Sequence, residues 1–315
     1  MRLLILMLLI LGCAHKTSDR FREGDNTGQE VDLSVEDERK LSQEALKEMQ
    51  KDYPKTKDKE LQAYIERIGQ KLVKANGLNN NPYTYTFTVV EMNQVNAFAL
   101  PAGTVFITVP IIAMAESEAE IAGVIGHEIG HVTARHTAER MYIQKKEQKK
   151  TWLLGGVGAA IGGTAGYYLG KKLCDPKDTQ CKAKYALYGA GGGAAGGLLI
   201  QKYGFLQNSQ EDELESDRVG FRYAVKAGYD KDKIGDFYNK LAKLEEQSRK
   251  GQNSFMNWVT DAMSTHPPSK KRVAQAQELR NSTPKNADSS NVSEFKSMKE
   301  RASKIMKAMP PAAQN

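Results

Sequence analysis

Hydrophobic residues recur at helical spacing in several stretches of the chain, and these stretches predict its helices. Apolar positions follow the capping residue Ser34 as far as about Tyr53, and Leu61, Ile65, Ile68 and Leu72 share one face of a second predicted helix that ends near Ala75. Further helices are expected over 116–141, in two or three segments after residue 230, and as a basic amphipathic tail over 292–309.

Alternation of apolar and polar residues predicts a small sheet between the second and third helices. Residues 83–89 alternate strictly and are typical of a half-buried strand. Segments 95–100 and 104–109 predict two more strands, joined by the turn Pro101-Ala102-Gly103. We therefore expect an α+β fold that is mainly helical, with a small, mostly antiparallel sheet.

The first thirteen residues have the pattern of an export signal. Leu3 to Leu11 form an apolar run that is too short for a permanent membrane span, and Gly12 precedes Cys13. The segment resembles the lipobox of bacterial lipoproteins, in which cleavage falls before the cysteine and its thiol is acylated. We expect residues 1–12 to be a signal peptide, Cys13 to carry a lipid, and residues 13–33 to form a flexible tether. An ordinary secretion signal with an incidental cysteine is the alternative.

Composition and charge narrow the class of protein. The chain has 315 residues, of which 40% are hydrophobic and 26% charged, and this excludes a wholly disordered chain or a collagen-like fibre. Its net charge of +7 is spread out rather than clustered with aromatic residues, so we expect no nucleic-acid partner. A basic protein close to an anionic membrane is the simpler interpretation.

A glycine-rich stretch interrupts the chain at residues 152–204, which hold 14 of its 27 glycines. Two charge-free runs, 153–170 and 185–200, place glycine at every fourth position, and this pattern predicts a helical hairpin with a close glycine seam. Both runs are at the lower limit of membrane-spanning length, so we favour a soluble or peripherally docked hairpin over an inserted one. Cys174 and Cys181 lie between the runs and form an even pair if Cys13 is acylated; we expect a disulfide, with two free thiols as the alternative.

The predicted helix over 116–141 contains His127-Glu128-Ile129-Gly130-His131, an HExxH sequence. Residues four apart lie on one helical face, so both imidazoles can point at one metal ion while Glu128 reaches a water bound to it. Ile121, Ile125 and Ile129 form a different stripe that can be buried. A catalytic zinc site needs a third protein ligand and an open position for water.

An acidic stretch downstream, Glu211 to Asp217, offers that third ligand. Glu213 and Asp217 share one helical face, and Glu211 and Glu215 share another. Spacing alone does not choose between the two pairs. A solvated acidic start of a helix is the alternative interpretation.

Five stretches together resemble the HtpX-like and CAAX-prenyl-endopeptidase-like metallopeptidases, which are gluzincins. The zinc helix with Val132, Arg135 and His136 is similar to the family's HEIGHV-x-x-RH helix. The other similar stretches are 96–103 (NAFALPAG), the run 118–124 that leads into the zinc helix, 213–217 (ELESD) and 264–268 (STHPP), in the family's order. Ala102 stands where the family usually has glycine. With the lipobox, the pattern is closest to the periplasmic lipoprotein branch.

The resemblance implies a zincin-type fold and a role for each site residue. His127, His131 and Glu213 would bind one Zn²⁺ per chain, and Glu128 would be the general base that takes a proton from the zinc-bound water. Asp217 would orient a ligand imidazole, and His136 would be structural. His266 would stabilise the oxyanion or occupy the metal's open position at rest. Substrate would pair with the edge strand through Asn96, Ala97, Phe98 and Ala99.

These expectations define a functional hypothesis. Residues 34–280 would form a zinc metalloendopeptidase domain that carries the 152–204 insert, followed by a linker and tail helix over 281–315. Attached by lipid to the cell envelope and facing the periplasm, it would cleave unfolded or misassembled envelope proteins, with the outer membrane favoured because Ala14 follows the cysteine. One alternative is a lipoprotein whose glycine hairpin serves assembly, and another is zinc storage at a closed four-ligand site.

Overall fold

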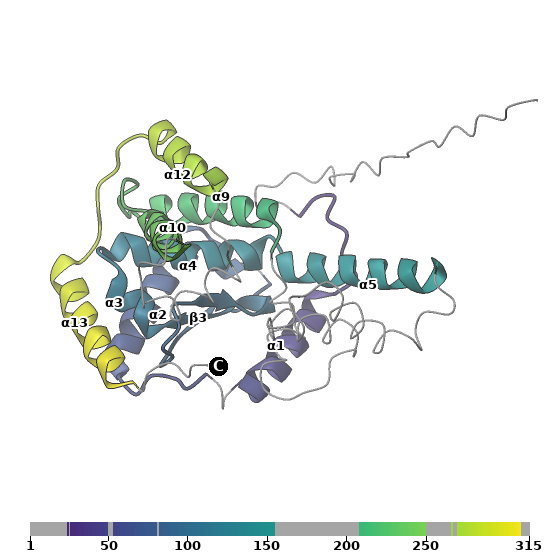
Figure 1. Ribbon diagram of the computed structural model, residues 1–315, viewed down its shortest axis with the longest axis horizontal. Helices are drawn as coiled ribbons and strands as arrows, with labels where there is room; N and C mark the ends of the chain where they lie inside the picture. The colour runs from purple at the N-terminus through teal and green to yellow at the C-terminus, as the bar shows by residue number, and fades with distance from the viewer. Residues whose placement is uncertain are drawn as a thin grey trace, which may run out of the picture.

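The structure, a computed structural model, describes residues 24, 26–49, 53–80, 82–154, 208–249, 266 and 270–309. Helices surround a three-stranded sheet (Figure 1), so the predicted α+β class is confirmed. The elements are α1 (Val35–Met49), α2 (Lys59–Ala75), η1 (Leu78–Asn80), β1 (Thr86–Val90), β2 (Ala97–Ala99), η2 (Pro101–Gly103), β3 (Thr104–Thr108), α3 (Val109–Met114), α4 (Glu118–Thr133), α5 (His136–Leu154), α9 (Gln210–Lys226), α10 (Asp236–Arg249), α12 (Lys270–Ser282) and α13 (Val292–Ala308).

The sheet is mixed rather than mostly antiparallel, because its strand order is β1-β3-β2. β2 and β3 form the expected antiparallel pair around η2, whereas β1 and β3 run parallel with Thr86 opposite Thr104. The strand that follows β1 in the sequence, β2, does not pair with it. β3 lies between the two and runs parallel to β1. Ala102 adopts a left-handed φ of 64° in the turn, the conformation that a glycine would take without strain. β2 is left at the edge of the sheet, as predicted.

The predicted helix over 116–141 is broken in two, which corrects the sequence analysis. α4 ends at Thr133, Arg135 adopts φ 53°, and α5 begins at His136 (Figure 1). Neither glycine nor proline marks the break. Instead, the Arg135 side chain is held by the carboxylate of Glu38 at 3.2 Å and by the carbonyl of Leu33 at 2.7 Å. These tertiary contacts stabilise a left-handed residue that local sequence does not favour.

The part of the predicted tether that the structure describes is docked on the domain. We call residues 24 and 26–33 the N-terminal strap. The side-chain amides of Asn26 and Gln29 donate to the carbonyls of Thr133, the last residue of α4, and of Ala134, which caps that helix. The strap thereby satisfies backbone acceptors at a helix end, while the flexible tether expected over residues 13–33 stays a prediction.

The predicted tail helix, α13, also belongs to the core. Its buried residues Phe295, Met298 and Ala302 pack within the main hydrophobic cluster, and Arg301 pairs with the α2 capping residue Asp58 at 2.9 Å. The described part of the catalytic domain therefore packs together with a helix that lies beyond residue 280.

α4 and α9 approach so closely that glycine is required where they cross. A Cβ atom on Gly220 of α9 would lie 2.5 Å from the backbone nitrogen of His127, and a Cβ atom on Gly126 would lie 2.7 Å from the carbonyl oxygen of Gly220. Every residue of α4 is buried, including both histidines of the HExxH sequence. The crossing places the acidic start of α9 beside those histidines.

Several predictions fall outside the described residues. They are the signal peptide, the lipid on Cys13, the glycine-rich hairpin and the pairing of Cys174 with Cys181. Among the helices in the described ranges, none is long and apolar enough to span a membrane.

The helix crossing predicts a large effect of one methyl group. Gly220→Ala should lower the free energy of unfolding by about 2 kcal/mol, because overpacking costs roughly 1–3 kcal/mol or more and exceeds a helix-propensity gain of about 1 kcal/mol. The control is Gly77→Ala, which meets no atom within 4 Å and should lose about 1 kcal/mol through its left-handed backbone alone. Urea unfolding of both variants measures this, and a smaller loss for Gly220→Ala would contradict it.

Candidate metal centre

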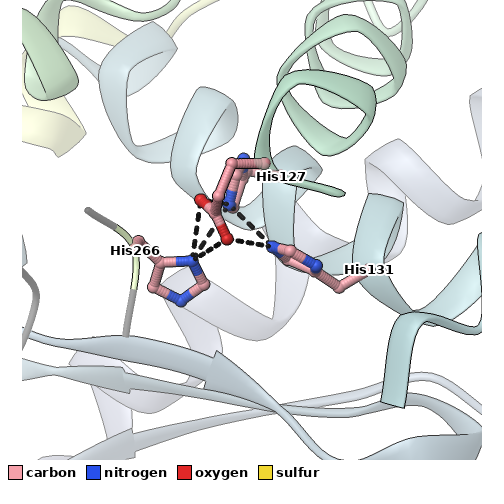
Figure 2. Close-up of side chains that lie close together, drawn as sticks. His127, His131 and His266 are labelled. Atoms are coloured by element: carbon pink, nitrogen blue, oxygen red, sulfur yellow. Dashed lines mark hydrogen bonds and ion pairs between the residues drawn. The ribbon is translucent and has the colours of Figure 1, made fainter. Parts of the chain in front are cut away.

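Four side chains from three parts of the chain converge on one point inside the protein. His127 and His131 lie one turn apart on α4, Glu213 lies in the first turn of α9, and His266 precedes α12. The Nε2 atoms of His127 and His131 are 2.9 Å apart, and each lies 3.3 Å from a carboxylate oxygen of Glu213. Figure 2 shows the three imidazoles directed toward one another. One ligand atom from each of the four side chains lies within 4.8 Å of the other three.

This donor set fits a zinc ion. Imidazole nitrogen and carboxylate oxygen are the ligand types that Zn²⁺ takes in catalytic sites. Burial holds the pKa of His131 well below its ordinary value, so that ring is neutral. Burial disfavours charge on Glu213, yet His266, Arg272 and His127 outweigh it and keep the Glu213 pKa well below its usual range. His131 is thus neutral and Glu213 ionised, which are the forms that a metal requires of these two ligand types.

The electrostatics around His127 also favour a cation. Burial alone would lower the pKa of this imidazole, but the carboxylates of Glu213 and Asp217 outweigh that effect and raise it to about 9. A positive charge is therefore stabilised at the point where the four side chains meet. A bound metal ion would supply that charge and displace the proton.

Glu128 borders the cluster without belonging to it. Its side chain is 2% exposed, and its Oε1 lies 3.5 Å from Nε2 of His266. Burial raises the pKa of Glu128 above the ordinary value. A carboxylate with a raised pKa beside a metal site is suited to accept a proton near neutral pH.

Asp217 lies where the resemblance implied, against the second nitrogen of a ligand imidazole. Its Oδ1 is 2.8 Å from Nδ1 of His127, one turn along α9 from Glu213. Such contacts fix the tautomer and ring orientation of a ligand histidine.

Arg272 of α12 is a site residue that the sequence analysis missed. Its guanidinium contacts both oxygens of Asp217 at 2.6 and 2.7 Å and one oxygen of Glu213 at 2.8 Å, and its side chain is 4% exposed. Because it follows two lysines in a helix of low apolar periodicity, the sequence suggests a solvated position. The sequence feature that could have indicated a role for Arg272 in the site is its position soon after the STHPP stretch.

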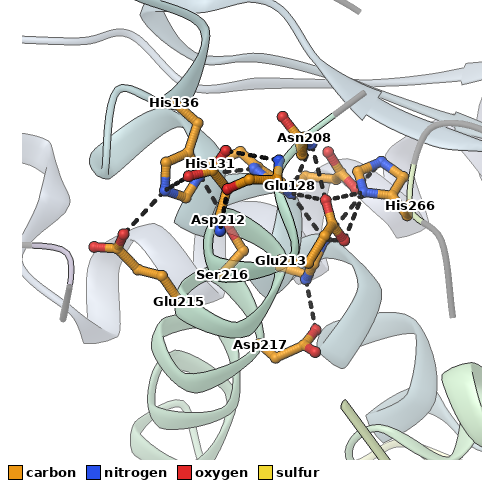
Figure 3. Close-up of polar contacts among 12 residues, drawn as sticks. Glu128, His131, His136, Asn208, Asp212, Glu213, Glu215, Ser216, Asp217 and His266 are labelled. Atoms are coloured by element: carbon orange, nitrogen blue, oxygen red, sulfur yellow. Dashed lines mark hydrogen bonds and ion pairs between the residues drawn. The ribbon is translucent and has the colours of Figure 1, made fainter. Parts of the chain in front are cut away.

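The acidic residues of α9 face different surroundings. Glu213 faces the two histidines, whereas Glu211 is exposed to solvent. Glu215 is buried but points away from the cluster, toward His136, whose Nε2 lies 3.1 Å from its Oε2 (Figure 3). His136 in turn contacts Nδ1 of His131, so it stands behind a candidate ligand, as expected for a structural role.

The predicted substrate strand lies next to the zinc helix. β2 packs on α4 and is bonded to β3 on one side, so the residues described leave its other side unpaired. Thr108 donates to the Asn96 carbonyl and Leu100 donates to the Thr104 carbonyl, which places the even-numbered residues toward β3. The backbone groups of Ala97 and Ala99 consequently face the open edge, whereas Phe98 is bonded inward and buried.

A cavity adjoins the metal cluster. It lies between α4, α9, α10 and α12, and His127, His266 and Arg272 form part of its wall. Its remaining lining is largely apolar and includes Phe221, Ile234, Leu241 and Leu279. The site therefore has an apolar recess beside it.

A buried HExxH helix and an acidic ligand from a second helix together define a metallopeptidase type of site. Residues 59–280 match the peptidase family M48, and the chain belongs to that family.

Comparison with curated proteins finds relatives with related names. The chain is 29% identical over 249 residues to the beta-barrel assembly-enhancing protease of Yersinia pestis and 28% identical over 250 residues to that of Escherichia coli K12. Each alignment covers 79% of this chain and 45% of the relative. The mitochondrial metalloendopeptidase OMA1 of Arabidopsis thaliana is 29% identical over 218 residues, which is 68% of this chain and 36% of the relative. The chain thus spans about half the length of the bacterial relatives.

The geometry predicts which carboxylate holds the metal. Glu213→Gln should lower zinc affinity by more than about 100-fold, because a direct ligand matters more than an outer partner. Glu211→Gln, one exposed position on the same helix, is the matched control and should leave affinity unchanged. Competition with a fluorescent zinc chelator measures both, and equal zinc affinities in the two variants would contradict the assignment.

Proposed function

We propose that this chain is a zinc-dependent metalloendopeptidase that cleaves extended polypeptides in the bacterial cell envelope. The observation that carries the proposal is the placement of Glu128 beside the cluster of His127, His131 and Glu213. Membership of the M48 family supports the same conclusion.

The residues of the site divide the work of hydrolysis. Zn²⁺, held by His127, His131 and Glu213, would polarise the scissile carbonyl and lower the pKa of water. Glu128 takes the proton from the attacking water and passes it to the leaving amine. Asp217 holds the ligand His127 in place during proton transfer, and Arg272 holds the ligand Glu213.

Edge strand β2 supplies the affinity for substrate. An extended peptide adds to the open side of β2 through the backbone groups of Ala97 and Ala99, and this main-chain pairing tolerates varied sequences. Tolerance of this kind suits an enzyme that acts on unfolded proteins. The apolar cavity beside His127 receives a side chain of the bound peptide.

The cellular setting is inferred from the N-terminal pattern and from the names of the bacterial relatives. A lipid on Cys13 would anchor the chain, with the outer membrane favoured and the catalytic domain in the periplasm. The relatives are named for enhancing beta-barrel assembly, so we propose misfolded or misassembled envelope proteins as clients.

One observation favours a second candidate function. His266 lies within the cluster, with Nδ1 3.2 Å from Nε2 of His127 and 3.1 Å from Oε1 of Glu213. Four donors would close a zinc site, and a closed site suits zinc storage rather than catalysis. In the protease hypothesis the same geometry is a resting arrangement from which His266 withdraws when substrate binds.

Substitution of the general base separates the two functions. Glu128→Gln should lower the rate of casein cleavage by about 10²–10⁴-fold, because proton transfer is lost while shape is kept. Zinc content and thermal unfolding should match the wild type, and a phenanthroline-treated wild type should regain activity when zinc is restored. Undiminished cleavage by Glu128→Gln would refute the mechanism, and a zinc-loaded wild type with no proteolysis would favour storage.

The strand-pairing hypothesis predicts the effect of removing one backbone donor. Ala99→Pro should lower kcat/KM for an unfolded substrate by up to about tenfold, because a hydrogen bond contributes about 0.5–1.5 kcal/mol. The fold should persist, since proline is tolerated on an edge strand when its nitrogen faces outward. Ala99→Ser keeps the donor and is the control. An unchanged kcat/KM in the proline variant would show that substrate does not pair at this position.

A further inference from the structure

A continuous series of contacts joins the N-terminal strap to a candidate zinc ligand. The backbone N–H of Gly24 donates to Oε1 of Glu215 at 2.8 Å. The other oxygen of Glu215 lies 3.1 Å from Nε2 of His136, and Nδ1 of His136 lies 2.8 Å from Nδ1 of His131. Figure 3 shows His136 lying between His131 and Glu215. Both Glu215 and His136 are almost fully buried, so water does not substitute for these partners.

The chemistry of these contacts assigns each ring its tautomer. The Glu215 carboxylate only accepts hydrogen bonds, so His136 carries a proton on Nε2, and in the neutral ring Nδ1 is then an acceptor. His131 then donates from Nδ1, and its Nε2 lone pair faces the metal cluster, as a ligand requires. Asp212 lies farther from His136, at 4.0 Å, and is paired with Arg140. Glu215 therefore determines which nitrogen donates in each hydrogen bond that links Glu215, His136 and His131.

Gly24 fits its place in ways that another residue would not. Its φ of 77° lies in the left-handed region, and an added Cβ atom would lie 3.2 Å from Val219 of α9. The backbone of the strap therefore packs closely against α9 at Gly24, whose N–H donates to Glu215. Along the same strap, Asn26 and Gln29 bind the end of α4 just after His131.

We propose that the N-terminal strap is a positioning element of the metal centre, which fixes the imidazole of His131 through Gly24, Glu215 and His136. This inference rests on the proposed zinc site and deepens it. None of the three residues touches the metal or the substrate. They act by holding one ligand in the tautomer and orientation that binding needs.

Zinc affinity of the full-length protein tests the proposal without recourse to activity. Glu215→Gln should raise the zinc dissociation constant by about 10–100-fold, as loss of an outer partner does, and should change the visible spectrum of the Co²⁺-substituted protein. Glu211→Gln is the control on the same helix. Gly24→Ala should raise the constant by a smaller factor, and Gly28→Ala, which has a similar φ of 78° at an exposed position of the strap, should leave it unchanged.

A double variant shows whether Gly24 affects zinc binding through Glu215. In the Glu215→Gln background, adding Gly24→Ala should weaken zinc binding no further, because the contact through which Gly24 acts is already altered. A full, additive loss would overturn the proposal, and so would an unchanged zinc affinity in Gly24→Ala. If Glu215→Gln does not fold, the comparison of Gly24→Ala with Gly28→Ala decides the question. A wild type that binds no zinc would instead refute the proposed function.

Discussion

The close crossing of α4 and α9 is the constraint on which the rest of the structure depends. One helix carries two imidazoles at a spacing of four, but a third donor has to come from elsewhere in the chain. The crossing at Gly126 and Gly220 lets the backbones approach closely enough for Glu213 to reach both rings. A side chain at either glycine would move α9 away from α4 and Glu213 away from the two imidazoles.

Burying so many ionisable groups together is costly unless each has a partner, and the surroundings of the site supply those partners. Arg272 balances Glu213 and Asp217, while Arg140 holds Asp212. Glu215 is engaged by His136 and by the strap. The candidate ligands are thus surrounded by charge-balancing partners, as a preorganised metal site requires.

Sequence pattern predicts the local parts of this design better than the long-range ones. HExxH spacing identifies His127 and His131, and helical periodicity identifies α2 and most of α4, because both features are local. The break at Arg135, the parallel pairing of β1 with β3 and the packing of α13 depend on tertiary contacts that no short pattern encodes. Arg272 and Glu215 resemble ordinary surface charges of a helix, so only the fold reveals their partners. Choosing Glu213 over Glu211 and Glu215 required the family resemblance, and the geometry agrees with it.

Anomalous diffraction at the zinc absorption edge, from crystals of the zinc-loaded protein, tests the central claim most directly. We predict one strong peak at about 2.0–2.2 Å from Nε2 of His127, from Nε2 of His131 and from a Glu213 oxygen. A peak bound by Glu215 or Asp212 instead, or a metal that leaves Glu213 without contact, would contradict the account.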